Sequence, residues 1–316
     1  MFDSRANPRK IGNRQREDPF MEWRGKRTSR NIEDRRRSGG ARGGLPGIRI
    51  GGGRGGRPLG ILGTIVVLLI GAYFGVDLSG LTGSSGSFNA PTQQTTQTGP
   101  NTIDDDEEAF VATILGETEQ VWTQIFAASG QRYTPTTLVL YRGGTGSACG
   151  MAQATMGPFY CPGDRRVYLD TDFFRVMEQQ LNAGGDFANA YVIAHEVAHH
   201  VQNLTGTLGE VNAQRARVSE RESNALSVRI ELQADCYAGV WAHAASRELA
   251  LTDADIREAL NTAARIGDDA LQRSAGGRVV PDSFTHGTSE QRQEWFFRGY
   301  RAGDPAQCDT FAARSL

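Results

Sequence analysis

The residues best suited to chemistry lie in the stretch AHEVAHH, where His195 and His199 are four positions apart and Glu196 directly follows the first. Positions four apart on a helix share one face, so both imidazoles can reach a single metal ion. Glu196 then points beside the open coordination position. There its carboxylate can accept a proton from a zinc-bound water, whose pKa the metal lowers towards neutrality. The spacing therefore indicates metal-assisted hydrolysis.

A tetrahedral catalytic zinc needs a third protein ligand, which should come from another element. His200 is rotated by about 100° from His199 around the helix and faces away. The better candidate is Glu231 in RIELQADCYAGVWAHA, with Asp235 one turn later on the same face. Glu231 can bind the metal, and Asp235 can accept the free N–H of a ligating histidine. The largely apolar surroundings argue against Glu231 being a solvated surface charge.

The alternative is a pair of core histidines that donate to backbone carbonyls. The chain has only five histidines in 316 residues, so His-Glu-x-x-His should arise by chance on the order of once in two hundred sequences of this composition. We therefore favour a metal site that holds one zinc ion per chain.

Several helices and a few strands would position these residues. Apolar spacing predicts helices over or near residues 103–130, 187–204, 219–247, 253–266 and 289–300. Asp186 and Thr252 are possible caps, and Thr288 with Gln291 is placed as a capping box.

Two stretches between the first two helices have strand character. Residues 134–143 fit a strand, and GPFYCPGDRRVYLD fits a hairpin that turns at Pro162-Gly163-Asp164. We expect the hairpin strand near Tyr168 to offer a free edge to an extended peptide. Strands followed by helices predict an α+β domain, mainly helical with a small sheet, over residues 104–316.

Charge is distributed unevenly along the chain. Residues 1–57 carry 16 Lys and Arg against 6 Asp and Glu, whereas residues 77–316 carry 18 against 30. The Arg- and Gly-rich residues 1–57 contain too few aliphatic side chains to order themselves, which predicts a disordered cytoplasmic tail. RNA binding is one alternative for this tail. Because no aromatic residues are interleaved, we favour contact with lipid headgroups and expect no specific nucleic-acid partner.

Residues 58–76, PLGILGTIVVLLIGAYFGV, carry no charge over 19 positions, enough at about 1.5 Å per residue to cross a hydrocarbon core of about 30 Å. We predict a transmembrane helix here. A buried soluble helix would have a polar face, and a cleaved signal peptide would begin earlier. Arg49, Arg54 and Arg57 place the N-terminus in the cytoplasm by the positive-inside rule. The polar residues 77–103 are expected to form a flexible linker.

All four cysteines, Cys149, Cys161, Cys236 and Cys308, follow this span. That is expected if the far side of the membrane is oxidising. Three pairings are possible; the short Gly-rich loop favours Cys149 with Cys161, which leaves Cys236 with Cys308. Four free buried thiols are the alternative.

The combination of His195-Glu196-x-x-His199 with Glu231-x-x-x-Asp235 resembles the gluzincin metallopeptidases. The stretches GPFYCPGDRRVYLD, HEVAHHVQ, ELQADCYAGVWA and DSFTHGTSEQR resemble more closely a bacterial, membrane-anchored family of neutral zinc metallopeptidases. This resemblance covers most of the chain from about residue 21, including WRGKRTSRNIEDRR and the predicted span. Residues 1–20 extend beyond it, so translation could start at residue 1 or 21.

The resemblance implies a zincin-like domain that hydrolyses peptide bonds of a peptide or protein substrate. It implies a single-pass protein of the bacterial inner membrane, with the catalytic domain in the periplasm or outside the cell. The competing hypothesis is a non-catalytic, zinc-stabilised domain that binds envelope proteins or acts as a chaperone.

The resemblance also implies a further catalytic residue. In gluzincins a histidine or tyrosine downstream of the glutamate ligand donates to the oxyanion, and His286 in SFTHGTSEQ has the corresponding chain order. A loop histidine without such a role is the alternative. Tyr168, Tyr237 or Tyr300 could serve instead.

Overall fold

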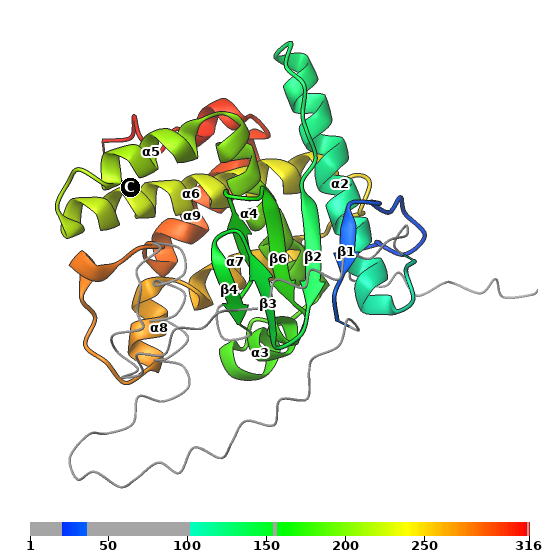
Figure 1. The fold of residues 1–316 in the computed structure, drawn as a ribbon, viewed down its shortest axis with the longest axis horizontal. Helices are drawn as coiled ribbons and strands as arrows, with labels where there is room; N and C mark the ends of the chain where they lie inside the picture. Colours follow the sequence, from blue (N-terminus) through cyan, green and yellow to red (C-terminus); the bar gives the residue numbers. More distant parts are fainter. Residues whose placement is uncertain (1–20, 37–101, 154–156, 315) are drawn as a thin grey trace, which may run out of the picture.

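The structure, a computed structural model, describes residues 21–36, 102–153, 157–314 and 316. These residues form an α+β fold in which most of the chain is helical and a small mixed sheet lies beside the helices (Figure 1). The strands are β1 (Ile32–Asp34), β2 (Thr137–Tyr141), β3 (Gly144–Ser147), β4 (Gly150–Gln153), β5 (Phe159–Cys161) and β6 (Arg166–Asp170). The α-helices are α2 (Asp106–Ala128), α3 (Asp172–Leu181), α4 (Asp186–Leu204), α5 (Thr207–Arg215), α6 (Glu220–Ala245), α7 (Asp253–Arg265), α8 (Asp268–Ser274) and α9 (Ser289–Ala302). Two short 3₁₀ helices are η3 (Pro281–Ser283) and η4 (Pro305–Cys308).

The larger sheet has the strand order β1-β2-β6-β5, and β3 and β4 form a separate hairpin. β1, β2 and β6 are parallel, whereas β5 runs antiparallel to β6. Strands of this kind are covered on both faces, and Leu138, Val139 and Leu140 of β2 accordingly have no exposed surface. The prediction of a free strand edge near Tyr168 is wrong, because Tyr168 lies in β6, which pairs on both sides. The strand at that end of the described sheet is β5.

The helix α4 lies at the centre of the domain. It packs against α2, α6 and α7 and against β5 and β6. Fifteen of its 19 residues are buried, so the helix that carries the two histidines has almost no face in contact with water. Polar side chains on it must therefore find partners inside the protein.

Two glycines allow α6 and α9 to run side by side at short range. A Cβ atom on Gly239 of α6 would overlap the backbone of Phe296, and one on Gly299 of α9 would overlap the backbone of Cys236. Only glycine lets the two backbones approach this closely. The contact places residues 296–300 of α9 next to residues 236–240 of α6.

Local signals located most helix starts. Thr252 caps α7, and Thr288 with Gln291 forms the predicted capping box of α9. Asp186 does not cap α4 as expected. It occupies the first helical turn, where its carboxylate accepts a 2.8 Å hydrogen bond from the indole N–H of Trp23. The short helices α3, α5 and α8 were not predicted from the sequence.

The prediction that residues 1–57 form a disordered tail is wrong for residues 21–36. Residues 32–34 form β1, which pairs with β2, and Met21, Trp23 and Ile32 are buried in the domain. These few apolar side chains are scattered among Arg and polar residues, so composition alone hides them. The remainder of the predicted tail, the predicted span 58–76 and residues 77–101 of the predicted linker lie outside the described residues.

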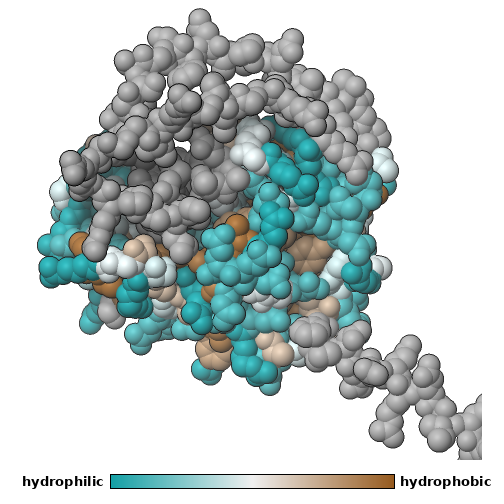
Figure 2. All heavy atoms as spheres, turned by 90° about the horizontal axis from the view of Figure 1, so that it is seen from below, coloured by the Kyte–Doolittle hydropathy of each residue, from teal (hydrophilic) through white to brown (hydrophobic). Residues whose placement is uncertain are grey.

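Two disulfides are present, in the pairing that the sequence favoured. Cys149–Cys161 joins the turn of the β3-β4 hairpin to β5, and Cys236–Cys308 joins α6 to the C-terminal segment. Such bonds persist in oxidising compartments, which indicates that this domain lies outside the cytoplasm. Hydrophilic side chains predominate where described residues form the face drawn in Figure 2. None of the described helices is long and apolar enough to cross a bilayer.

Candidate metal centre

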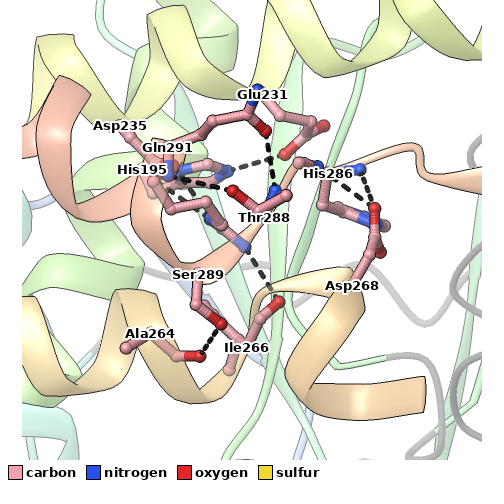
Figure 3. Close-up of polar contacts among 12 residues, drawn as sticks. His195, Glu231, Asp235, Ala264, Ile266, Asp268, His286, Thr288, Ser289 and Gln291 are labelled. Atoms are coloured by element: carbon pink, nitrogen blue, oxygen red, sulfur yellow. Dashed lines mark hydrogen bonds and ion pairs between the residues drawn. The ribbon is translucent and has the colours of Figure 1, made fainter. Parts of the chain in front are cut away.

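Three side chains from two helices meet at a buried point. α4 supplies His195 and His199, and α6 supplies Glu231, which points towards His195 in Figure 3. Glu231 Oε2 lies 3.1 Å from His195 Nε2, and Glu231 Oε1 lies 3.5 Å from His199 Nε2. Their exposed fractions are 3% for Glu231, 6% for His195 and 2% for His199. The chain thus brings together the three residues that the spacing indicated.

Asp235 fixes the orientation of the His195 ring. Its Oδ1 atom lies 2.8 Å from His195 Nδ1, and a carboxylate can only accept a hydrogen bond. The proton therefore sits on Nδ1, and a neutral His195 directs the lone pair of Nε2 towards Glu231.

A chain of amides fixes His199 in the same way. His199 Nδ1 lies 2.8 Å from Gln202 Oε1, while Gln202 Nε2 donates to the carbonyl of Ile230 at 2.8 Å and to Gln233 Oε1 at 3.0 Å. Gln233 in turn donates to the carbonyl of Cys308 at 3.1 Å. Because the Ile230 carbonyl accepts only, the Gln202 amide has one sensible orientation, with its oxygen facing the histidine. The Nε2 atom of a neutral His199 is then also unprotonated.

Behind Asp235 lies a buried arginine from α9. Arg292 donates from Nε to Asp235 Oδ2 at 2.8 Å and from Nη2 to Asp235 Oδ1 at 3.0 Å. The Tyr191 hydroxyl donates to the same Oδ1 at 2.5 Å. A fully buried carboxylate without such partners would be strongly destabilising. The two-point contact with Arg292 therefore holds Asp235 ionised and in place.

In this cluster, neighbouring charges shift the pKa values more strongly than burial does and keep the side chains in their charged forms. Burial opposes the charged form of His195, but Asp235 and Glu231 outweigh it and raise the pKa of His195 to about 10. Burial would raise the pKa of Glu231, yet the two histidines hold it well below its usual range. Likewise, Arg292 and His195 outweigh burial and lower the pKa of Asp235 to about 2. Without metal, the His195 ring is therefore protonated on both nitrogens, with Nδ1 facing Asp235 and Nε2 facing Glu231.

The geometry of the three ligand atoms fits zinc. Bonds of about 2.0–2.1 Å to a tetrahedral zinc require ligand atoms about 3.3 Å apart. His195 Nε2 lies 3.1 Å from Oε2 of Glu231 and His199 Nε2 lies 3.5 Å from Oε1, and one ligand atom from each of the three residues lies within 4.8 Å of the other two. Two imidazoles and one carboxylate, with both Nδ1 atoms held by acceptors, form a donor set typical of a catalytic zinc. A cation would also replace the proton on His195.

Glu196 also lies on α4, and its buried carboxylate is outside the hydrogen-bonded cluster. It is 8% exposed, and no described group donates a hydrogen bond to it. Burial raises the pKa of Glu196, and the neighbouring histidines only partly oppose the shift. A raised pKa brings the carboxyl closer to the range in which it can both accept and release a proton.

His286 lies on the other side of Glu231, paired with an aspartate from α8 (Figure 3). Its Nδ1 atom is 3.2 Å from Asp268 Oδ1, while Asp268 Oδ2 accepts from the backbone N–H groups of Thr285, His286 and Gly287. Burial opposes the charge on His286, but Asp268 and Glu231 outweigh it and raise the pKa of His286. Its side chain is 22% exposed. This imidazole is therefore a partly accessible proton donor next to the cluster.

Comparison with known proteins supports the chemistry of this donor set. Residues 21–311 match the family described as "Putative neutral zinc metallopeptidase". The chain belongs to this family. The match begins with the ordered segment at residue 21 and includes every residue of the metal cluster.

The chain is similar to proteins of Escherichia coli and of two Mycobacterium species. The chain is 50% identical over 292 residues to "Uncharacterized protein YpfJ" of Escherichia coli K12, covering 92% of this chain and 99% of that protein. It is 48% identical over 195 residues to "Uncharacterized protein Rv2575" of Mycobacterium tuberculosis, covering 58% of this chain and 65% of that protein. "Uncharacterized protein Mb2605" of Mycobacterium bovis matches over the same fractions. No solved structure matches.

The other candidate residues make contacts of a different kind. His200 faces away from the cluster, as predicted, with Nε2 2.7 Å from the carbonyl of Thr134. The Tyr168 hydroxyl donates to Asp164 in the hairpin turn. The ring of Tyr237 packs on Trp122, and that of Tyr300 packs on His243. Of the proposed oxyanion donors, His286 is the one with an electrostatic contact to Glu231.

Sequence reasoning missed three residues that support the site. These are Gln202, Asp268 and Arg292. Gln202 stands three positions after His199, a spacing that places it on the same side of the helix. That signal could have identified it. No local pattern links Arg292 to Asp235, which is 57 positions away.

Proposed function

We propose that this protein is a zinc-dependent peptidase that acts outside the cytoplasm. The observation that carries the proposal is the convergence of His195 Nε2, His199 Nε2 and the Glu231 carboxylate, all buried, beside the buried carboxylate of Glu196. One zinc ion at this point would act as a Lewis acid and make a bound water acidic enough to react near neutral pH.

The residues of the chain supply the remaining functions. Asp235 and Gln202 hold the two imidazoles in the tautomer that can bind metal. Glu196 accepts a proton from the attacking water and delivers it to the departing amine nitrogen. A carboxyl with a raised pKa suits both halves of this transfer. Water exclusion around the buried cluster strengthens each of these interactions.

His286 supports the same reaction by stabilising negative charge on the carbonyl oxygen of the substrate. Asp268 orients its ring through Nδ1, which leaves Nε2 to donate. Loss of one donor of this kind typically raises the barrier by roughly 3–4 kcal/mol. For His286→Ala we therefore expect a lower kcat with zinc retained.

The deciding experiment compares wild type with Glu196→Gln in the detergent-solubilised full chain. A peptide library is digested, and zinc is measured in the same samples. We expect cleavage by wild type and a loss of at least two orders of magnitude in Glu196→Gln at equal zinc content. Glu117→Gln, the same change at a buried carboxylate in α2, is the matched control and should remain active.

The second candidate function is a zinc-stabilised interaction or chaperone-like domain. Such a protein would bind zinc, cleave nothing in the library and behave identically in wild type and Glu196→Gln. That result would reject the peptidase. Absence of stoichiometric zinc in protein purified without chelators would reject both.

A further inference from the structure

Residues 21–36, here called the N-terminal strap, are built into the domain at both of their ends. At the start, Met21 N donates to Asp255 Oδ1 at 3.1 Å, and the Trp23 indole donates to Asp186 at 2.8 Å. Trp23 is 7% exposed and stacks edge-on against Phe110. The strap therefore anchors on α2, α4 and α7.

The middle of the strap crosses α2, whose residues at the contact suit it. A Cβ on Gly116 would come within 2.9 Å of the carbonyl of Arg27, so only glycine leaves room for the strap. Glu119 is 7% exposed and accepts hydrogen bonds from Ser29 at 2.5 Å and from Asn31 at 2.7 Å. Without the strap, α2 would keep a glycine in its interior, and Glu119 would lose these two hydrogen-bond donors.

The end of the strap adds a strand to the sheet. β1 pairs in parallel with β2, with Ile32 opposite Leu138, and Arg35 N donates to the carbonyl of Leu140 at 2.7 Å. Glu33 of β1 lies 2.7 Å from Arg166 of β6. In Figure 1 the blue strap lies against β2 and α2. Without β1, the edge of β2 would be open.

Several basic side chains of the strap form ion pairs with the domain. Arg36 forms ion pairs with Asp105 at 2.9 Å and with Glu107 at 3.2 Å, at the acidic first turn of α2. Lys26 pairs with Glu248 at 3.3 Å. These charges belong to residues 1–57, which were predicted to form a cytoplasmic tail. Their partners lie in the domain that carries the disulfides.

We infer that the N-terminal strap and the domain of residues 102–316 occupy the same side of the membrane, outside the cytoplasm. The two parts are joined through residues 37–101, which include the predicted span 58–76. A single crossing there would place them on opposite sides of the bilayer, where strand pairing between β1 and β2 is impossible. The strap is thus exported with the domain, and the predicted single-pass topology with a cytoplasmic N-terminus does not hold for the folded protein. This inference does not depend on peptidase activity.

The topology is tested on the full chain in bacterial cells. One epitope is added before residue 1 and a different one after residue 316, and intact spheroplasts are treated with proteinase K. We expect both epitopes to be digested. Protection of the N-terminal epitope together with loss of the C-terminal one would overturn the inference. Protection of both would keep the shared compartment but overturn its position outside the cytoplasm.

Docking of the strap is tested separately from folding defects by reversing the charges of one ion pair. In the detergent-solubilised full chain, we expect the strap amides that donate to β2, such as Arg35 N with the carbonyl of Leu140, to be protected from hydrogen exchange. Glu33→Arg should reduce this protection at least tenfold, and the double variant Glu33→Arg with Arg166→Glu should restore it. Arg24→Glu, at an exposed pair with Asp106, is the control and should change little. Unprotected amides in wild type, or no recovery in the double variant, would contradict strap docking.

Discussion

Gln202 offers the sharpest test of how the protein prepares its metal site. In Gln202→Met the side chain keeps a similar length, but His199 Nδ1 loses the acceptor that lies 2.8 Å away. When zinc is bound, Nε2 cannot carry the proton, so Nδ1–H loses its Gln202 acceptor at a position where Gln202 is 0% exposed. An unsatisfied buried donor costs about 1–3 kcal/mol.

The metal-free protein avoids this cost. His199 Nε2 is 3.5 Å from Glu231 Oε1, so the proton can move to Nε2 and point at the carboxylate. The penalty therefore falls mainly on the zinc-bound state. At 1.4 kcal/mol per factor of ten, zinc affinity should fall roughly 5- to 150-fold.

The assay is competition for zinc against a chromophoric chelator, with thermal unfolding of the metal-free variants recorded in parallel. Gln202→Glu is the control, because its carboxylate still accepts from Nδ1. We expect it to bind zinc at least as tightly as wild type, even though it loses the donors to Ile230 and Gln233. Wild-type affinity in Gln202→Met, or equal losses in both variants, would refute the role of the amide.

Three further predictions concern pH and stability. Burial disfavours the charged form of His195, but two carboxylates outweigh it and raise the pKa of His195 to about 10 without metal. Zinc must displace the proton from Nε2 of His195. Measured zinc affinity should therefore rise with pH, by up to about tenfold per pH unit, until about pH 10. A pH-independent affinity would contradict this. Gly239→Ala should lower the unfolding free energy by at least about 1–3 kcal/mol through overlap with α9, whereas Gly209→Ala, with open space around it, should not lower the melting temperature. Replacing Cys236 and Cys308 with serine should cost about 2–5 kcal/mol in thermal unfolding; an unchanged melting temperature would show that the bond is dispensable.

The parts of the protein that the sequence predicted are those specified by neighbours along the chain. The predicted helix over residues 187–204 corresponds to α4 (Asp186–Leu204), and that over residues 219–247 to α6 (Glu220–Ala245). A local capping box at Ser219 sets the start of α6, and apolar spacing located α4. Four-residue intervals within each helix then placed His195 with His199, and Glu231 with Asp235, on common faces.

The parts that could not be predicted depend on contacts between distant segments. Asp268 meets His286 because α8 and the loop before α9 fold together, and neither residue has a periodic pattern that marks the pair. The prediction of a disordered tail was wrong for residues 21–36 for a related reason. Its composition resembles a solvated tail, but its few apolar side chains and its charges have specific partners that only the folded domain provides. The composition of a segment gives its average polarity but does not identify the individual residues that it contacts.

Both ligating histidines are controlled from the C-terminal part of the chain. The hydrogen-bond path from His199 ends at the carbonyl of Cys308, and the path from His195 ends at Arg292 of α9. The disulfide Cys236–Cys308 and the close contact between α6 and α9 hold these two end points against the helix that supplies Glu231. A local change in α9 can therefore tilt His195, and one near Cys308 can tilt His199, without touching a metal ligand. It follows that metal affinity in this protein depends on the integrity of the whole α4-α6-α9 unit, because the elements that bind and the elements that orient are packed as one body.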